Sequence, residues 1–130
     1  MTVYLAVEQI QDLHRLQLRR YGGLAGLRDR GALEAAAARP QATFGGEDLY
    51  PDLPAKAGAL LHSLVLNHPF IEGNKRVGAH AAVLFLLANG LELTASSAAL
   101  AEVTLATARG EMSAEALAIW FRQRSQPLYG

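Results

Sequence analysis

The segment His68–Arg76, which reads HPFIEGNKR, holds the side chains of this chain best suited to chemistry. His68 can accept a proton near neutral pH. Glu72 offers carboxylate oxygen, a hard ligand that suits Mg²⁺ beside phosphates. Lys75 and Arg76 add two positive charges a few residues later. A base, a metal ligand and paired cations are the groups that transfer from a nucleoside triphosphate requires.

The same segment has the features of a phosphate-binding helix start. Gly73 and Asn74 suit a turn that leads into the apolar run 77–88. The first turn of a helix leaves backbone N–H groups unpaired and carries the positive end of the helix dipole, so it attracts phosphate. Gly73 lets the backbone approach a ligand closely. Lys75 and Arg76 cost stability at this end of a helix unless an anion offsets them, which is typical of a functional site.

Each of these residues also has an ordinary structural interpretation. His68 fits a polar residue at the end of a helix, and Glu72 fits a partner for the helix dipole. Lys75 and Arg76 fit a solvated helix face. This interpretation is sufficient for any one of them, whereas the whole set in nine residues favours a functional site.

The surrounding sequence predicts an all-α fold that positions this segment between two helices. The chain has 130 residues, 51% of them hydrophobic and rich in Ala and Leu, without a break in composition. We therefore expect one domain over residues 1–130, built from helices. Apolar spacing and capping residues predict helices at about 7–20, 31–39, 54–67, 74–89, 97–108 and 114–124, with Asp29, Ser96 or Ser97, and Ser113 as N-caps.

The helix over 74–89 is apolar almost all round beyond its first turn, so it is expected to be the buried centre of the fold. Residues 41–52, QATFGGEDLYPD, contain two glycines and a proline and show no helical period. They are predicted to form a loop or a small hairpin.

Charge and composition narrow the partners and the compartment. Twelve basic and twelve acidic residues give no net charge, which argues against direct nucleic-acid binding. The chain has no cysteine, which suits a reducing cytoplasm. The longest apolar run, 79–88, is far shorter than the ~20 residues that cross a bilayer, and the first residues lack a secretory signal pattern. We expect a soluble cytoplasmic protein that does not enter a membrane.

The other histidines do not predict a metal enzyme. The four histidines of the chain do not have the spacing of a zinc site; they are His14, His62, His68 and His80. His80 lies four residues after Arg76 on the same helical face and is expected to be a core histidine, with an approach to the site as the alternative.

HPFIEGNKR resembles the signature of the Fic/Doc family, whose members carry His-Pro-Phe, an acidic residue, Gly-Asn, and then Gly-Arg or Lys-Arg. Upstream, residues 20–51, RYGGLAGLRDRGALEAAAARPQATFGGEDLYP, resemble the corresponding part of the family's death-on-curing (Doc) toxins. The resemblance covers nearly the whole chain, and it implies a compact helical Fic/Doc domain with a small flap at 41–52. In this family the flap holds the target chain by strand-like pairing.

The residue at position 75 decides which chemistry the resemblance implies. Adenylyl-transferring members usually have a second glycine where this chain has Lys75. The Lys-Arg pair is similar to that of the Doc branch, in which ATP is thought to bind the other way round, with its γ-phosphate facing the acceptor. The resemblance therefore implies an ATP-dependent and Mg²⁺-dependent protein kinase acting on a Ser or Thr hydroxyl.

The resemblance also assigns a role to each residue of the segment. His68 is the catalytic base, and Glu72 is the metal ligand. Gly73 and Asn74 are nucleotide-binding residues that shape the anion loop. Lys75 and Arg76 both bind the nucleotide and act in catalysis by stabilising charge on the phosphates, while Phe70 anchors the loop in the core.

Two other functions remain open. Glu72 stands where many Doc proteins have Asp, and Gly73 where some have Ala, so the loop also resembles that of adenylyltransferases. A non-catalytic module that only binds an antitoxin or another partner is the third hypothesis.

The resemblance implies two protein partners. Many Fic proteins carry an inhibitory helix with the pattern Ser/Thr, three residues, Glu, then Gly or Asn. Neither Thr43–Glu47 nor Thr107–Glu111 completes this pattern. Inhibition is then expected to come from a separate protein, a small antitoxin whose C-terminal segment lies in a groove of this chain. The resemblance thus implies that the chain is the toxin of a type II toxin–antitoxin system. The implied substrate is a translation elongation factor of the Tu type, so that protein synthesis stops.

Overall fold

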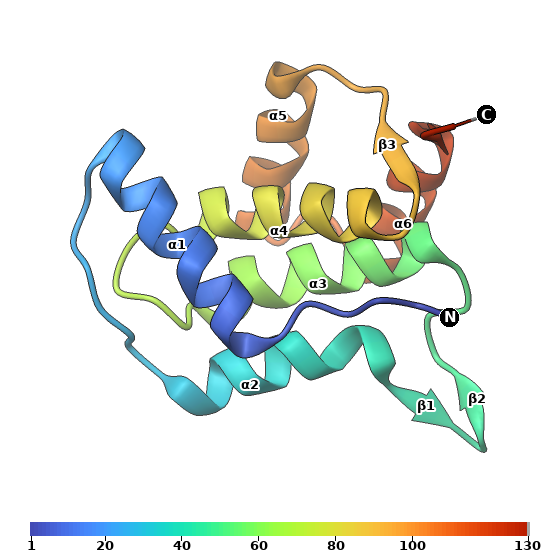
Figure 1. The fold of residues 1–130 in the computed structure, drawn as a ribbon, viewed down its shortest axis with the longest axis horizontal. Coiled ribbons are helices and arrows are strands. Elements are labelled where there is room, and N and C mark those ends of the chain that lie inside the picture. The colour runs from blue at the N-terminus through green and yellow to red at the C-terminus, as the bar shows by residue number, and fades with distance from the viewer. Residues whose placement is uncertain (130) are drawn as a thin grey trace.

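The computed structural model describes residues 1–129 and confirms the all-α prediction (Figure 1). The helices are α1 (Val7–Tyr21), α2 (Arg30–Ala38), the 3-10 helix η1 (Arg39–Gln41), α3 (Leu53–Asn67), α4 (Asn74–Ala88), α5 (Ser97–Ala108) and α6 (Ala114–Gln123). The strands are β1 (Thr43–Phe44) with β2 (Glu47–Asp48), and β3 (Leu91–Leu93) with β4 (Ser125–Pro127). None of the helices described is both long and apolar enough to cross a bilayer.

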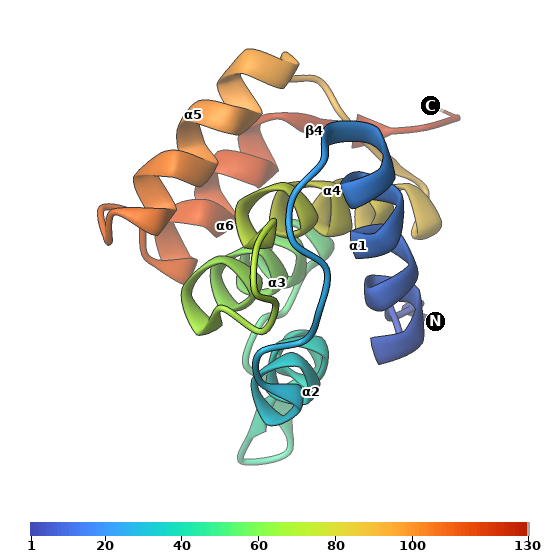
Figure 2. The same cartoon turned by 90° about the vertical axis from the view of Figure 1, so that its left-hand side faces the viewer.

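The centre of the fold is the antiparallel pair α3 and α4. Helix α4 is buried as predicted, and α3 is buried even more completely, from Pro54 to Val65 with few exceptions. The two helices approach closely at Gly78, where a Cβ atom would lie 2.9 Å from Cγ2 of Val65. Helices α1 and α2 pack on one side of this pair, while α5 and α6 pack on the other (Figure 2).

The predicted caps begin the helices as expected. The side chains of Asp29, Ser96 and Ser113 accept hydrogen bonds from the backbone N–H three residues later, at 3.0, 3.1 and 3.0 Å. Asp52 caps α3 in the same way, at 2.9 Å from the N–H of Ala55. Each of these bonds pairs a backbone donor that the first helical turn leaves free.

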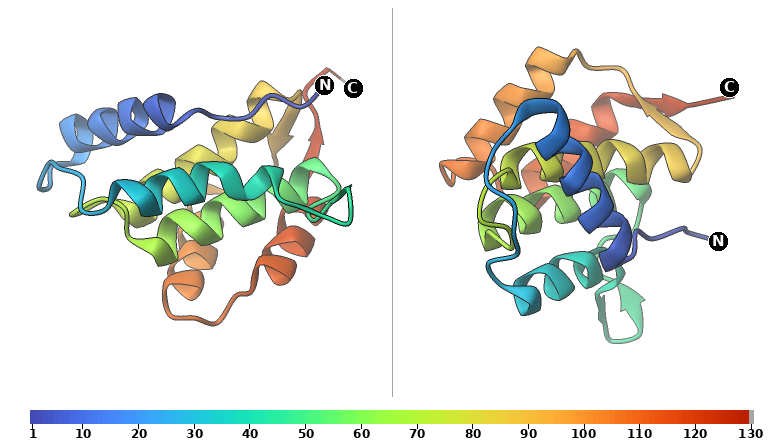
Figure 3. Two further views of the ribbon diagram at one scale, coloured as in Figure 1. Left: turned by 90° about the horizontal axis from the view of Figure 1, so that it is seen from below. Right: turned by 60° about the vertical axis from the view of Figure 1, so that its left-hand side comes forward.

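One strand pair was missing from the sequence prediction. Strands β3 and β4 pair antiparallel, Leu91 with Pro127 and Leu93 with Ser125, and so join the end of α4 to the end of α6. The N-terminal segment also lies beside the end of α4, since the backbone of Val3 bonds the Asn89 side chain at 2.7 and 2.8 Å (Figure 3). Strands of three residues are too short to show a period of their own, so only tertiary pairing reveals them.

The hairpin expected at 41–52 forms, with β1 and β2 joined by Gly45 and Gly46. The buried Lys56 fixes the base of the hairpin, because it donates hydrogen bonds to Asp48 Oδ2 at 3.1 Å and to the Pro40 carbonyl at 3.3 Å. The hairpin lies at the start of α3, whereas the HPFIEGNKR loop lies at its end (Figure 1). A helix of this length spans ~22 Å, so the hairpin does not cover that loop.

Candidate active site

The HPFIEGNKR segment is the connection between α3 and α4. His68 is the C-cap of α3 and is exposed, with a left-handed backbone (φ 48°, ψ 56°). It is the one non-glycine residue with positive φ among residues 1–129. Gly73, with φ 85°, is the N-cap of α4. Because left-handed backbone is unfavourable for a side-chain-bearing residue, neighbouring contacts must hold His68 in place.

Arg28 supplies the strongest of these contacts. It donates from Nε to the His68 carbonyl oxygen and from Nη2 to that of Asn67 at 2.8 Å. The backbone N–H groups of Arg28 and Asp29 also donate to the Pro69 carbonyl, at 2.8 and 3.0 Å. The last carbonyls of a helix have no partner within the helix, so this clamp fixes the end of α3 and the backbone of His68. Sequence reasoning gave Arg28 no role.

The segment before α2 runs antiparallel to the loop and orients Glu72. Leu27 forms a β-bridge with Phe70, and the Ile71 N–H donates to the Gly26 carbonyl at 3.1 Å. The Leu24 N–H then donates to Glu72 Oε2 at 2.9 Å. This bond fixes the carboxylate through one oxygen and leaves Oε1 for a cation.

His14 supports the loop from the core side and was not recognised from the sequence. The ring is only 3% exposed and stacks on Phe70, with centroids 3.8 Å apart and planes at 9°. Nε2 lies 2.7 Å from the Glu72 carbonyl oxygen, and since a carbonyl accepts, Nε2 carries the hydrogen. A Cβ atom on Gly73 would lie 3.3 Å from that nitrogen. Phe70 is 3% exposed and thus lies in the core, as expected.

Asn74 closes the loop through its side chain. Oδ1 accepts from the Phe70 N–H at 3.0 Å, and Nδ2 donates to the Phe70 carbonyl at 2.9 Å. Both ends of the amide are thereby used on the backbone. The first backbone hydrogen bond within α4 runs from the Val77 N–H to the Gly73 carbonyl, at 2.9 Å. The backbone N–H groups of Asn74, Lys75 and Arg76 precede this bond and therefore remain for an anion.

The structure brings all the predicted site residues into one cleft of about 460 Å³. Its lining is His68, Ile71, Glu72, Gly73, Asn74, Lys75, Arg76 and Ala108. His68 and the Glu72 carboxylate thus share one space with the first turn of α4, which carries Lys75 and Arg76. Such a space can hold a polyanion between a proton acceptor and cationic donors.

Arg76 and His80 lie on one face of α4, four residues apart. The Arg76 guanidinium lies over the Tyr21 ring, 4.6 Å from its centroid. His80 is half-buried, and burial lowers its pKa below the usual 6.5, with the charges of Arg20 and Arg76 acting in the same direction. His80 does not line the cleft of His68; it lines a neighbouring cavity that also contacts Lys75 and Arg76.

The residues of the cleft suit a metal ion that is bound jointly by the protein and by the phosphates of a nucleotide. Within residues 1–129, no three His, Cys, Asp or Glu side chains converge. Glu72 stands at the cleft as a single carboxylate with one free oxygen. Mg²⁺ is commonly held by one or two carboxylates together with substrate phosphates, which is the arrangement this cleft could provide.

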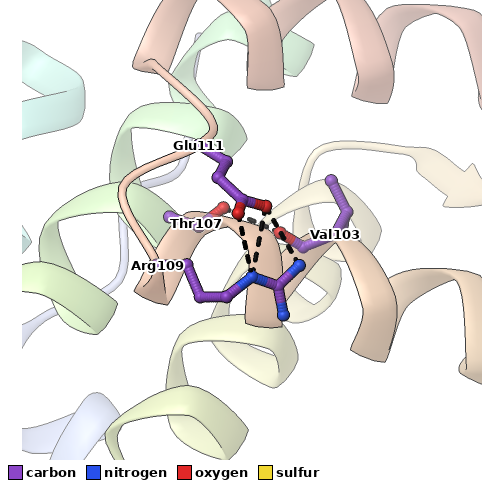
Figure 4. A network of polar contacts seen from close by, with 4 residues as sticks. All are labelled: Val103, Thr107, Arg109 and Glu111. Carbon is purple, nitrogen blue, oxygen red and sulfur yellow. Dashed lines mark hydrogen bonds and ion pairs between the residues drawn. The ribbon is translucent and has the colours of Figure 1, made fainter.

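Two segments match the inhibitory pattern in part, but the glutamate of neither segment lines the cleft. Thr43–Glu47 lies in the hairpin. At the end of α5, Glu111 turns back on Arg109, with oxygen–nitrogen distances of 3.0 to 3.1 Å, while Thr107 bonds the carbonyl of Val103 at 2.8 Å (Figure 4). Hydrogen bonding to Arg109 lowers the pKa of Glu111, which favours its charged form.

Fold and site agree with the comparison to known proteins. Residues 4–86 match the Fic/DOC family, and the chain belongs to this family. It is 47% identical to the "Toxin Doc" of Mycolicibacterium smegmatis over 95 residues, which are 73% of this chain and 71% of that protein. It is 35% identical to the "Protein kinase doc" of Escherichia phage P1 over 127 residues, 98% of this chain and 96% of the other. The resemblance predicted from HPFIEGNKR is thereby confirmed.

Proposed function

We propose that this chain is the toxin of a type II toxin–antitoxin pair and acts as an ATP-dependent and Mg²⁺-dependent protein kinase. Its substrate would be a Ser or Thr hydroxyl of a translation factor, of the elongation factor Tu type, and the outcome would be arrest of protein synthesis. The observation that carries this proposal is the single cleft in which His68, Glu72 and the first turn of α4 meet. The names of the two relatives, one a toxin and one a protein kinase, support it.

In the proposed reaction, His68 removes the proton of the acceptor hydroxyl as its oxygen attacks the γ-phosphorus. The bond between that phosphorus and the β–γ bridging oxygen breaks, and ADP leaves. Bound Mg²⁺ would neutralise phosphate charge, and Glu72 Oε1 would hold it. Backbone N–H groups of the first turn of α4, with Lys75 and Arg76, would bind the phosphates and stabilise the charge that moves to the leaving group.

Rigid support for these groups favours catalysis over simple binding. The Arg28 clamp fixes the backbone of His68, and Leu24 and His14 fix Glu72 through its side chain and its carbonyl. Positioning of reacting groups contributes strongly to enzymatic rates, and a binding surface does not require it at a single histidine.

Adenylyl transfer is the second candidate. The observation that favours it is the pair Glu72 and Gly73, which matches the adenylylating branch more closely than the Doc branch. Lys75 favours the kinase, because a long side chain replaces the small residue beside which adenylyltransferases place the terminal phosphates.

The hairpin is not the nearest candidate for acceptor binding. A target strand paired to it would need about seven extended residues to reach His68, since each residue adds ~3.3 Å. The segment from Leu24 to Arg28 borders the loop directly. We infer that an acceptor paired with the hairpin would also contact this segment.

Transfer of label from ATP to proteins of a translation extract tests the proposal. The purified chain, free of antitoxin, is incubated with ATP labelled on either the γ- or the α-phosphate, with His68→Ala as control. We expect transfer of the γ label alone, lost in the variant. Transfer of the α label would establish the adenylyltransferase instead. No transfer of either label, together with toxicity that survives His68→Ala, would establish a binding module.

A further inference from the structure

A polar cluster that takes no part in the cleft lies where the hairpin joins the helices. Its members, which we call the Arg39 cluster, are Arg39, Tyr50, His62 and Ser63. Arg39 begins η1, shortly before the hairpin, and Tyr50 follows the hairpin. His62 and Ser63 lie on α3, so the cluster connects both ends of the hairpin to this central helix.

The Arg39 guanidinium makes every bond of the cluster. Its Nε donates to the Tyr50 hydroxyl at 2.9 Å, and the guanidinium also lies over that ring, 5.6 Å from the centroid. Its Nη1 donates to His62 Nδ1 at 2.7 Å and to Oγ of the buried Ser63 at 2.9 Å. Because both bonds to α3 come from one nitrogen, a displacement of Nη1 breaks both.

The bond to His62 requires a neutral ring. A guanidinium has N–H donors and no acceptor, so Nδ1 of His62 must accept and carries no hydrogen. A proton added to Nδ1 would place a second donor and a second positive charge 2.7 Å from Nη1 of Arg39. Like charges at this distance repel, so protonation and the bond exclude one another.

We propose that the Arg39 cluster is a pH-sensitive attachment of the hairpin. When His62 gains a proton, Arg39 separates from α3, and Tyr50 and the ends of the hairpin move with it. The inference goes beyond the proposed function and does not depend on it, since no residue of the cluster lines the cleft.

The surroundings of His62 set the pH at which the attachment is lost. The charged groups that act on the ring are Arg39 from η1 and Glu115 from α6. Burial, followed by the charge of Arg39, lowers the pKa of His62 below 6.5, while Glu115 acts in the opposite direction. The ring is therefore neutral and the attachment complete at neutral pH. The attachment is lost as the pH falls through this lowered pKa.

The contacts that remain allow the hairpin to pivot without unfolding. Lys56 still donates to Asp48 and to the Pro40 carbonyl. The bond from the Leu49 N–H to the Ala42 carbonyl, at 2.8 Å, still closes the hairpin. None of these bonds involves a histidine, so protonation of His62 removes one of two attachments.

Movement of Tyr50 also changes the surface beside the hairpin. Tyr50 lines a groove of about 330 Å³, together with Ala118 and Ile119 of α6. This groove therefore has one shape while the Arg39 cluster is intact and another after Tyr50 has moved.

The test is an NMR titration of the isotope-labelled chain from about pH 7.5 to about pH 5. We expect the amide signals of residues 43–50 to move with the same midpoint as the ring protons of His62, below pH 6.5. His62→Gln keeps an acceptor for Arg39 at every pH, so this movement should disappear. His80→Gln is the matched control, because it removes another half-buried histidine of lowered pKa that lies outside the cluster. It should leave the movement unchanged.

A second variant, Tyr50→Phe, removes the hydroxyl that joins Arg39 to the hairpin and leaves His62 free to titrate. The hairpin signals should then no longer follow His62, which keeps the test valid if His62→Gln does not fold. Wild-type hairpin signals that stay fixed while His62 gains its proton would overturn the proposal. So would a movement that persists in His62→Gln or in Tyr50→Phe, or one that all amides of the chain share.

Discussion

Gly73 offers a measurement of how tightly the loop is held. Its φ of 85° is unfavourable for any residue with a Cβ atom, and that atom would lie 3.3 Å from Nε2 and 3.4 Å from Cδ2 of His14. Left-handed backbone alone costs about 1–2 kcal/mol for a non-glycine residue. We therefore predict that Gly73→Ala lowers the free energy of unfolding by at least about this amount, because the contact with His14 adds to the backbone cost, and the melting temperature by at least roughly 4–8 °C in a chain of this size.

Gly90 provides the matched control. It has nearly the same φ, 83°, but a Cβ atom there would meet nothing within 4 Å. Gly90→Ala should therefore show the backbone cost without the contact to His14. The difference between the two variants in the free energy of unfolding, measured with urea, gives the cost of the steric contact with the His14 ring.

The two variants should differ more in activity than in stability. Pressure on His14 disturbs the bond from its Nε2 to the Glu72 carbonyl and shifts the loop that carries the cleft. Gly73→Ala should lower γ-label transfer by at least about tenfold, because small displacements of reacting groups are costly, while Gly90→Ala keeps the wild-type rate. Wild-type transfer by Gly73→Ala, or an equal loss in both variants, would refute the reasoning.

Three further outcomes are expected. Arg28→Lys cannot donate to two carbonyls in the same planar geometry, so transfer should fall by about tenfold to a hundredfold while the circular dichroism spectrum stays unchanged. Burial, followed by the nearby charge of Arg39, lowers the pKa of His62 below 6.5, so this residue makes stability fall as pH drops from about 7 to about 5. Urea titrations of His62→Gln should show a flatter dependence over that range. Arg122→Gln removes a half-exposed pair with Asp52, so it should cost less than about 1 kcal/mol at neutral pH. The Arg122 hydrogen bond lowers the pKa of Asp52, so the difference from wild type should vanish as acid protonates that carboxyl.

The sequence predicted those parts of the fold that local physics determines. Asp29, Ser96 and Ser113 begin helices because each bonds a backbone N–H three residues away, and the pattern is visible in a short window. The strands at Leu91–Leu93 and Ser125–Pro127 were missed because each is stabilised only by the other, more than thirty residues away.

The same distinction applies to the candidate site. HPFIEGNKR is contiguous, so its residues could be recognised together and they do share a cleft. Arg28 and His14 act on backbone carbonyls 40 and 58 residues away in sequence, and no local pattern encodes such bonds. Asn74 was predicted to bind the nucleotide by shaping the anion loop; its amide groups are bonded to Phe70, which makes its backbone N–H the group it offers to an anion.

The left-handed backbone of His68 also has a consequence for the order of events in folding. The groups that hold the loop, among them Arg28 and His14, come from α1 and the segment after it, far away in sequence. Non-local contacts of this kind form late, because the chain must first close long loops, whereas helices α3 and α4 can form from local interactions. A chain that has gained its helices but not yet docked α1 would therefore lack an active site. On refolding, helical circular dichroism should return before transfer activity, and a newly made toxin would remain harmless until its last long-range contacts close.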